Sequence, residues 1–149
     1  MSWRAWRIPR VILVVEDNED HAELIRQFLD GEGGPDKKVY WVRDGEEALD
    51  FMRHRGAHAD APRPNLILLD LNLPKTSGLE VLKEVKEDPD LKVIPVVMLT
   101  TTDRNEEVTA CYQLGVNSFV TKPATYDDYM EKLQSVRHYW LSTNREVQP

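Results

Sequence analysis

Short apolar runs alternate with longer segments of helical period along the chain, and this alternation repeats five times. The runs have the length of strands, and the central ones are apolar at consecutive positions, which is typical of strands covered by helices on both faces. They occupy residues 11–15, 39–42, 66–69, 94–99 and 118–120. The pattern therefore predicts five buried strands, each followed by a helix.

Apolar side chains recur at helical spacing between the predicted strands. Three such faces are Ala22, Ile25 and Leu29; Leu79, Leu82 and Val85; and Tyr129, Leu133, Val136 and Trp140. Asp44 is placed to cap the second helix, and Gly115 to end the fourth. This (βα)5 order predicts an α/β fold with a doubly wound parallel five-stranded sheet. We expect one domain over residues 10–141, an N-terminal extension at 1–9 and a C-terminal tail at 142–149.

Composition narrows the class of protein. A chain of 149 residues suits one domain. Its 26 acidic residues outnumber 19 basic ones, and the net charge of −7 disfavours nucleic acid as a partner. No apolar run approaches the roughly 20 residues that span a bilayer. The single cysteine, Cys111, cannot form an internal disulfide, which fits a reducing compartment. We expect a cytoplasmic protein that binds neither nucleic acid nor membrane.

Polar residues follow four of the five predicted strands. In an open parallel sheet, ligands bind beyond the carboxyl ends of the strands. The residues at these ends are Glu16, Asp17 and Asn18; Asp70 and Asn72; Thr100; and Lys122 with Pro123. Three carboxylates, a hydroxyl and an amine are therefore expected to meet at one edge of the sheet.

This combination suits the chemistry of phosphate with a bound Mg²⁺ ion. Glu16, Asp17 and Asp70 offer the hard oxygen ligands that Mg²⁺ takes. Asp70 can also act as a nucleophile, because carboxylates form aspartyl phosphates. Lys122 and Thr100 can bind phosphoryl oxygens through their N–H and O–H groups. The three negative charges would be balanced by Lys122 together with the metal.

Each of these residues also has an ordinary interpretation. An acidic pair after a strand is commonly a solvated turn or a helix cap, and Thr100 can satisfy its own backbone. His21, which follows the acidic pair, is interpreted as a surface residue of the first helix. The prediction of a site rests on complementary groups at four separate strand ends.

Four segments resemble the receiver domain of two-component response regulators. They are VILVVEDNEDH, LILLDLNLPKTSG, VVMLTTTD and NSFVTKPA. The resemblance runs from about residue 11 to residue 140, nearly the whole chain. It implies a flavodoxin-like receiver fold with the strand order 2-1-3-4-5.

The resemblance also assigns roles to the acidic residues. It implies that Asp70 is the phosphoacceptor. It makes Glu16, Asp17, Asp70 and the backbone carbonyl of Asn72 the ligands of Mg²⁺. Glu16 stands where aspartate is commoner in the family, which should preserve metal binding with a slightly different reach.

Four further residues receive roles from the resemblance. Thr100 is the hydroxyl that shifts toward the phosphoryl group, and Phe119 is the aromatic residue that follows it inward. Lys122 pairs with the phosphate, and the Lys122–Pro123 peptide bond is expected to be cis. Phe119 also has the simpler interpretation of a core residue on a short strand.

The function implied by the resemblance is a phosphorylation-dependent switch and not a metabolic enzyme. Asp70 would accept a phosphoryl group from a sensor histidine kinase, and output would come through protein contacts or dimerisation without a DNA-binding domain. The sequences of these motifs are most similar to those of regulators paired with bacterial phytochrome kinases. The aromatic residues of the last helix favour a homodimer through that region; they are Tyr126, Tyr129, Tyr139 and Trp140.

Two other functions are alternatives for the same fold. A phosphohydrolase of the haloacid dehalogenase type would need a second carboxylate two residues after the nucleophile, where this chain has Asn72. A flavodoxin-like flavin carrier would need a phosphate-binding loop where Glu16 and Asp17 stand. The role of Trp3 and Trp6, in a basic N-terminal arm, stays open.

Overall fold

The structure is a computed structural model that describes residues 10–30 and 37–145. The predicted N-terminal extension at 1–9, with Trp3 and Trp6, and residues 146–149 of the predicted tail lie outside the described residues. The strands are β1 (Arg10–Val15), β2 (Lys37–Val42), β3 (Leu66–Leu69), β4 (Val96–Thr100) and β5 (Ser118–Thr121). They form one parallel sheet in the order β2-β1-β3-β4-β5, as the resemblance implied.

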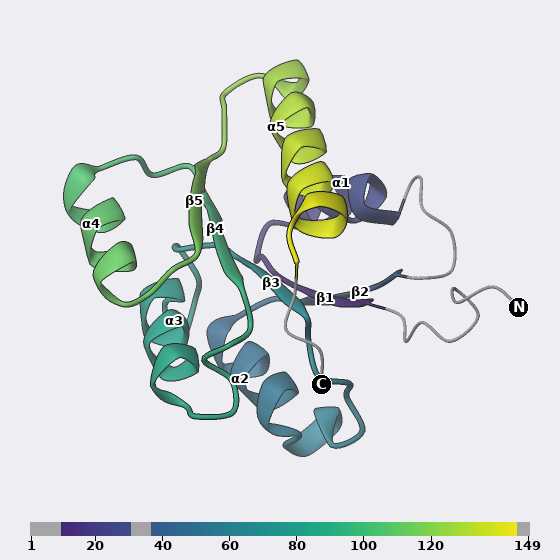
Figure 1. Ribbon diagram of the computed structural model, residues 1–149, viewed down its shortest axis with the longest axis vertical. Coiled ribbons are helices and arrows are strands. Elements are labelled where there is room, and N and C mark those ends of the chain that lie inside the picture. The colour runs from purple at the N-terminus through teal and green to yellow at the C-terminus, as the bar shows by residue number, and fades with distance from the viewer. Residues whose placement is uncertain (1–9, 31–36, 146–149) are drawn as a thin grey trace, which may run out of the picture.

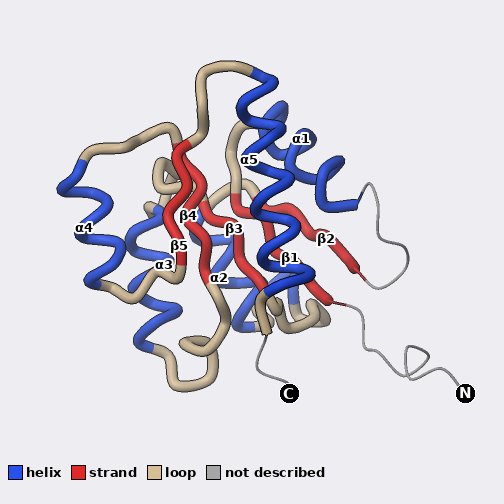
Figure 2. Tube along the Cα trace, turned by 45° about the horizontal axis from the view of Figure 1, so that its top comes forward, coloured by secondary structure: helices blue, strands red, loops and turns tan. Residues whose placement is uncertain are grey.

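Helices follow every strand and cover both faces of the sheet. They are α1 (Glu19–Asp30), α2 (Gly45–Arg53), α3 (Gly78–Glu87), α4 (Asn105–Gln113) and α5 (Tyr126–His138). A short 3-10 helix, η3 (Gly56–His58), follows α2, and a π-helical turn, η4 (Tyr139–Thr143), follows α5. Helices α1 and α5 lie on one face, and α2, α3 and α4 lie on the other (Figure 1). The tube in Figure 2 shows the same three layers.

Successive side chains of a strand point to opposite faces of the sheet and so belong to two different cores. In β1, Leu13 and Val15 pack toward α2, α3 and α4, whereas Ile12 and Val14 pack toward α1 and α5. The predicted helix faces are buried in these cores, and Leu133 of α5 is one of the most completely buried side chains. Burial on both faces explains why the strand sequences are apolar at consecutive positions.

Local signals place the helix ends close to where the sequence predicted them. The Asp44 side chain accepts a hydrogen bond of 2.8 Å from the backbone N–H of Glu47 and so caps α2. Gly115 has a φ of 98°, a left-handed conformation that follows the end of α4. Strand β4 begins at Val96, two residues later than predicted, because Pro95 has no N–H for the ladder.

The prediction of a cis peptide bond between Lys122 and Pro123 is wrong, since this bond is trans in the structure. The trans form of an X–Pro bond is intrinsically favoured by about 0.5–1 kcal/mol, and only tertiary packing overrides that preference. Within residues 10–30 and 37–145, none of the helices combines the length and hydrophobicity that crossing a bilayer requires.

Candidate functional site

The predicted site residues meet at the carboxyl edge of the sheet. Backbone hydrogen bonds continue the sheet just beyond the strands. Asp70 N–H donates to the Val15 carbonyl at 3.0 Å, and Lys122 N–H donates to the Thr100 carbonyl at 2.7 Å. The ladder therefore fixes the backbone of Asp70 and Lys122.

Three carboxylates form a compact acidic cluster. Glu16, Asp17 and Asp70 each offer an oxygen, and these oxygens lie within 4.8 Å of one another. Glu16 and Asp70 are buried, with 2% and 8% of their surface exposed, whereas Asp17 is exposed. Closely spaced carboxylates with one open side are the ligand set of a Mg²⁺ ion, which keeps several waters. The cluster is thus a candidate site for a divalent metal.

The Lys122 ammonium lies beside the buried carboxylates. Its Nζ is 2.5 Å from Glu16 Oε2 and 3.1 Å from Asp70 Oδ2, and it is 3.2 Å from His21 Nδ1. An ammonium has three N–H donors, so these contacts account for all of them. Because the Lys122 side chain is only 3% exposed, its charge is compensated by protein groups more than by water.

Burial and charge alter the proton affinity of two groups here. Burial is the main reason that the pKa of the Glu16 carboxyl is raised to about 7; Lys122 opposes the rise, and the Asp70 charge adds to it. Burial lowers the pKa of His21, and the positive charge of Lys122 adds to this effect. Both groups are therefore shifted toward their uncharged forms in the metal-free protein.

The loop after β3 holds the second oxygen of Asp70. Asp70 Oδ1 accepts a hydrogen bond of 2.9 Å from the backbone N–H of Asn72. The Asn72 amide in turn reaches Thr100 Oγ1 at 3.5 Å and Thr102 Oγ1 at 3.4 Å. One side chain therefore links the loop that carries Asp70 to the loop that follows β4.

Gly78 allows α3 to start directly against Asp70. A Cβ atom at this position would lie 2.2 Å from the Asp70 carbonyl oxygen, closer than any side chain tolerates. Gly78 N–H also donates to the Leu71 carbonyl at 3.0 Å. The close approach keeps the loop between β3 and α3 compact.

The predicted switch residues occupy different environments. Thr100 has no exposed surface and lies next to the Asn72 amide. Phe119 is half-buried and packs against the core on the side of α2, α3 and α4. Thr100 therefore adjoins the acidic cluster, and Phe119 lies one strand away, on β5.

Three residues near the site were missed in the sequence. His21 was taken for a surface residue but contacts Lys122. Trp41 donates from its indole N–H to the Glu16 carbonyl at 2.7 Å, and the Tyr129 ring lies 5.9 Å from the His21 ring. The first-turn position of His21, four residues after Asp17, was the available signal.

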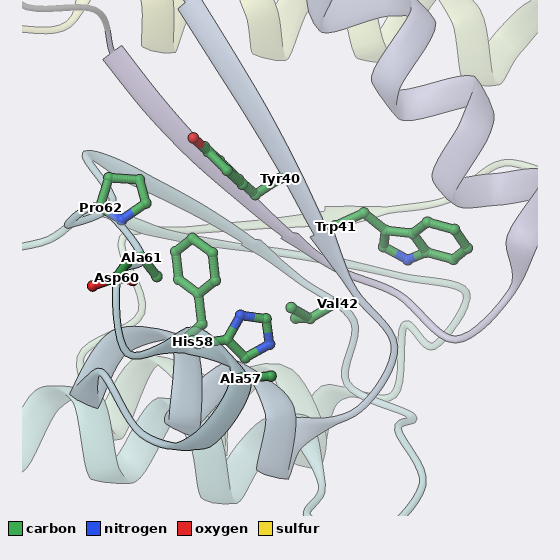
Figure 3. Close-up of a pocket in the computed structure, with 9 residues that line it drawn as sticks. Tyr40, Trp41, Val42, Ala57, His58, Asp60, Ala61 and Pro62 are labelled. Carbon is green, nitrogen blue, oxygen red and sulfur yellow. The ribbon is translucent and has the colours of Figure 1, made fainter.

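A cavity of about 220 Å³ lies elsewhere, between β2 and the α2–η3 segment (Figure 3). The Phe51 ring packs against Tyr40 and His58 at 5.4 and 5.3 Å, and His58 Nε2 lies 3.1 Å from Glu47 Oε1. In Figure 3 the Trp41 ring points away from the other labelled side chains. None of the predicted site residues lines this cavity.

Comparison with known proteins decides between the candidate functions. The model of the response regulator receiver domain matches residues 12–134. The chain belongs to this family. It is 44% identical over 135 residues to response regulator Rcp1 of Synechocystis sp., covering 91% of each chain.

Two solved structures share the fold closely. The Mn²⁺-bound form of Rcp1 has a TM-score of 0.90 at 43% identity, covering 94% of this chain and 100% of that one. The phosphorylated cyanobacterial phytochrome response regulator RcpA has a TM-score of 0.90 at 41% identity, covering 94% and 99%. The chain is a phosphoaccepting receiver domain, a switch and not a metabolic enzyme. This sets aside the hydrolase and the flavin carrier.

Proposed function

We propose that Asp70 is the phosphoacceptor and that its phosphorylation controls the output of this receiver domain. The main support is the setting of Asp70, a buried carboxylate fixed between Lys122 Nζ at 3.1 Å and the Asn72 N–H at 2.9 Å. These donors leave the carboxylate oriented next to an acidic pair that can bind a cation. Positioning and charge compensation are what phosphoryl transfer requires of a protein.

The donor is the phosphohistidine of a sensor histidine kinase. An Asp70 carboxylate oxygen attacks phosphorus, and a P–O bond forms as the P–N bond of the phosphohistidine breaks. The bonding electron pair stays on the imidazole nitrogen of the kinase. Lys122 donates hydrogen bonds to the transferred phosphoryl oxygens, which carry most of the charge in the transition state.

The metal of the site is Mg²⁺, held by Glu16, Asp17, Asp70 and the backbone carbonyl of Asn72. The carboxylate oxygens within 4.8 Å of one another support this assignment, as does the Mn²⁺-bound form of the related Rcp1. When bound, Mg²⁺ neutralises charge on the phosphoryl oxygens. Glu16 and Asp17 supply the negative charge that retains the ion.

Phosphorylation shifts Thr100 toward the phosphoryl group, and Phe119 moves further into the core on the same face. Thr100 is buried, and its hydroxyl meets the Asn72 amide at the weak distance of 3.5 Å. A phosphoryl oxygen is a stronger acceptor for this hydroxyl than a neutral group. The half-buried position of Phe119 leaves part of its ring to be buried in the phosphorylated state.

The kinase is of the phytochrome type, and the exchange takes place in the cytoplasm. The partner assignment rests on the 41% identity to RcpA, a cyanobacterial phytochrome response regulator. The single, buried cysteine, Cys111, is in keeping with a reducing compartment. Phosphotransfer from a phytochrome-type kinase should exceed transfer from an unrelated histidine kinase; equal rates would contradict this pairing.

A homodimer through the α5 region provides the output surface. Tyr126 and Tyr139 are 61% and 49% exposed, whereas Tyr129 and Trp140 are buried in the monomer. Sedimentation of a Tyr126→Ala/Tyr139→Ala variant should give a lighter species than wild type at micromolar concentration. Val93→Ala, at an equally exposed position outside this region, is the control. An unchanged mass of the double variant would refute the dimer.

Intact-mass measurement after incubation with acetyl phosphate and Mg²⁺ tests the phosphoacceptor. Wild type should gain one phosphoryl group, and omission of Mg²⁺ should slow the gain strongly. Asp70→Asn should gain none. A metal-independent gain, or an equal gain in Asp70→Asn, would refute the proposal.

A further inference from the structure

The third hydrogen bond of Lys122 goes to a side chain outside the acidic cluster. His21 Nδ1 is 3.2 Å from Lys122 Nζ, and 4.0 Å from Glu16 Oε1. Because an ammonium only donates, the nearer contact requires that Nδ1 carries no proton and that the ring proton is on Nε2. His21 is therefore a neutral acceptor for Lys122.

Two contacts restrict the position of His21. The first turn of α1 is anchored by a 3.0 Å hydrogen bond from the His21 backbone N–H to Asn18 Oδ1. On the other side, the ring lies 5.9 Å from the buried Tyr129 ring of α5, at an angle of 59°. The backbone of His21 and one side of its ring thus have defined partners in the protein without a ligand.

This contact differs from the two carboxylate contacts of Lys122. The Glu16 and Asp70 carboxylates that bind the ammonium are also the groups that the proposed metal ion and phosphoryl group require. An ion on Glu16 competes with Lys122 for that carboxylate, and transfer to Asp70 converts its carboxylate into an acyl phosphate, a mixed anhydride. His21 Nδ1 takes part in neither exchange.

We propose that His21 is a positioning residue for phosphoryl transfer, whose Nδ1 keeps the Lys122 ammonium beside Asp70 while the carboxylates change partners. The inference rests on the proposed function of Asp70. His21 does not touch the phosphoryl group in this account and acts only through Lys122. Its loss should therefore slow phosphorylation of Asp70 without abolishing it.

Two substitutions separate the acceptor from the bulk of the ring. In His21→Asn, Oδ1 occupies a position close to that of Nδ1 and retains an acceptor, whereas His21→Leu fills similar space without one. Leucine is the better helix former of the two, so a purely structural role for residue 21 would favour His21→Leu. The positioning role predicts the opposite order.

The test measures the phosphorylation rate with acetyl phosphate at saturating Mg²⁺ and fixed pH. His21→Leu should be slower than wild type by about three- to tenfold, the effect of losing one typical hydrogen bond. His21→Asn should stay within about twofold of wild type. In a Lys122→Met background, His21→Leu should cause no further loss, because its effect passes through Lys122.

The failures of the two proposals are distinguishable. If wild type is not phosphorylated, the proposed function fails. If wild type is phosphorylated and His21→Leu matches it, or if His21→Leu slows the Lys122→Met protein as much as it slows wild type, only the role of His21 is overturned. Long-range ¹H–¹⁵N correlation spectra of the metal-free protein give an independent check. They should show the proton of His21 on Nε2, and a proton on Nδ1 would overturn the inference.

Discussion

Two lysines lie at opposite ends of the same pair of strands, and both use all their donors. Lys86 Nζ donates to the Lys92 carbonyl, the Ile94 carbonyl and Asn117 Oδ1, each at 3.0 Å, at the amino ends of β4 and β5. Lys122 donates to Glu16, Asp70 and His21 at the carboxyl ends. The number of bonds is equal, but the partners differ in charge.

This difference separates a structural lysine from a functional one. The acceptors of Lys86 are neutral and belong to fixed loops, so its bonds have one stable arrangement. Lys122 faces the carboxylates of Glu16, Asp70 and the adjacent Asp17, which carry more negative charge than one ammonium balances. The negative charge at the carboxyl edge therefore requires a further cation for balance, whereas the neutral acceptors at the amino edge require none.

The largest expected effect is on phosphorylation. Lys122→Met should lower the rate with acetyl phosphate by about 100-fold, the typical loss when one donor to a charged transition state is removed. Lys86→Met, measured at a temperature where the variant is folded, should keep the wild-type rate. Equal losses in the two variants would show that the two lysines are not distinct in function.

The effect of Mg²⁺ on the free energy of unfolding should differ between the two lysine variants. Without Mg²⁺, Lys122→Met should lose about 3 kcal/mol of unfolding free energy, because its removal leaves buried carboxylates unpaired. Lys86→Met should lose about 2 kcal/mol through three acceptors without a donor. Mg²⁺ should restore much of the loss in Lys122→Met and none of the loss in Lys86→Met, as measured by urea unfolding. Equal restoration would contradict the comparison.

The pH dependence of the unfolding free energy tests the raised pKa of Glu16 at the carboxyl edge. The folded-state pKa of Glu16 is raised from 4.5 to about 7, so Glu16 stabilises the metal-free fold below pH 4.5, and this contribution is lost as pH rises through about 7. The Glu16→Gln variant has no carboxyl group at this position and therefore does not lose this stability as pH rises. Its unfolding free energy relative to wild type should therefore rise by about 3 kcal/mol between pH 4.5 and pH 8. A difference that does not change with pH would contradict the raised pKa.

The smallest expected effect concerns a hydroxyl behind the site. Tyr129 Oη is buried and makes no hydrogen bond to any residue that the structure describes. Tyr129→Phe keeps the ring beside His21 and removes an unsatisfied polar group, so stability should rise by up to about 1 kcal/mol. A loss of stability would mean that the hydroxyl has a partner, such as a bound water.

The sequence was sufficient to predict much of the fold and the acidic edge. Consecutive apolar positions such as 66–69 correctly indicated buried strands, and the capping role of Asp44 followed from side-chain chemistry alone. The meeting of Glu16, Asp17 and Asp70 followed from the rule that parallel strands share a carboxyl edge. The strand order, by contrast, came from the family resemblance, because apolar runs do not specify which strand lies next to which.

Other features depended on contacts that a linear pattern does not contain. The contact of His21 with Lys122 joins residues 101 positions apart, so helical periodicity could show only that His21 lies near the start of α1. The isomer of the bond before Pro123 depends on whether packing overrides a small intrinsic preference for trans, which a linear pattern does not show. Trp140 was counted toward a dimer surface, yet the structure buries it in the monomer core.

Identification of the modified residue tests the central claim most directly. Protein treated with acetyl phosphate and Mg²⁺ is reduced with borohydride, which converts an aspartyl phosphate to homoserine, and is then digested for mass spectrometry. The account predicts homoserine at position 70 in wild type and in Lys86→Met. Modification at another carboxylate, with Asp70 intact, would contradict it.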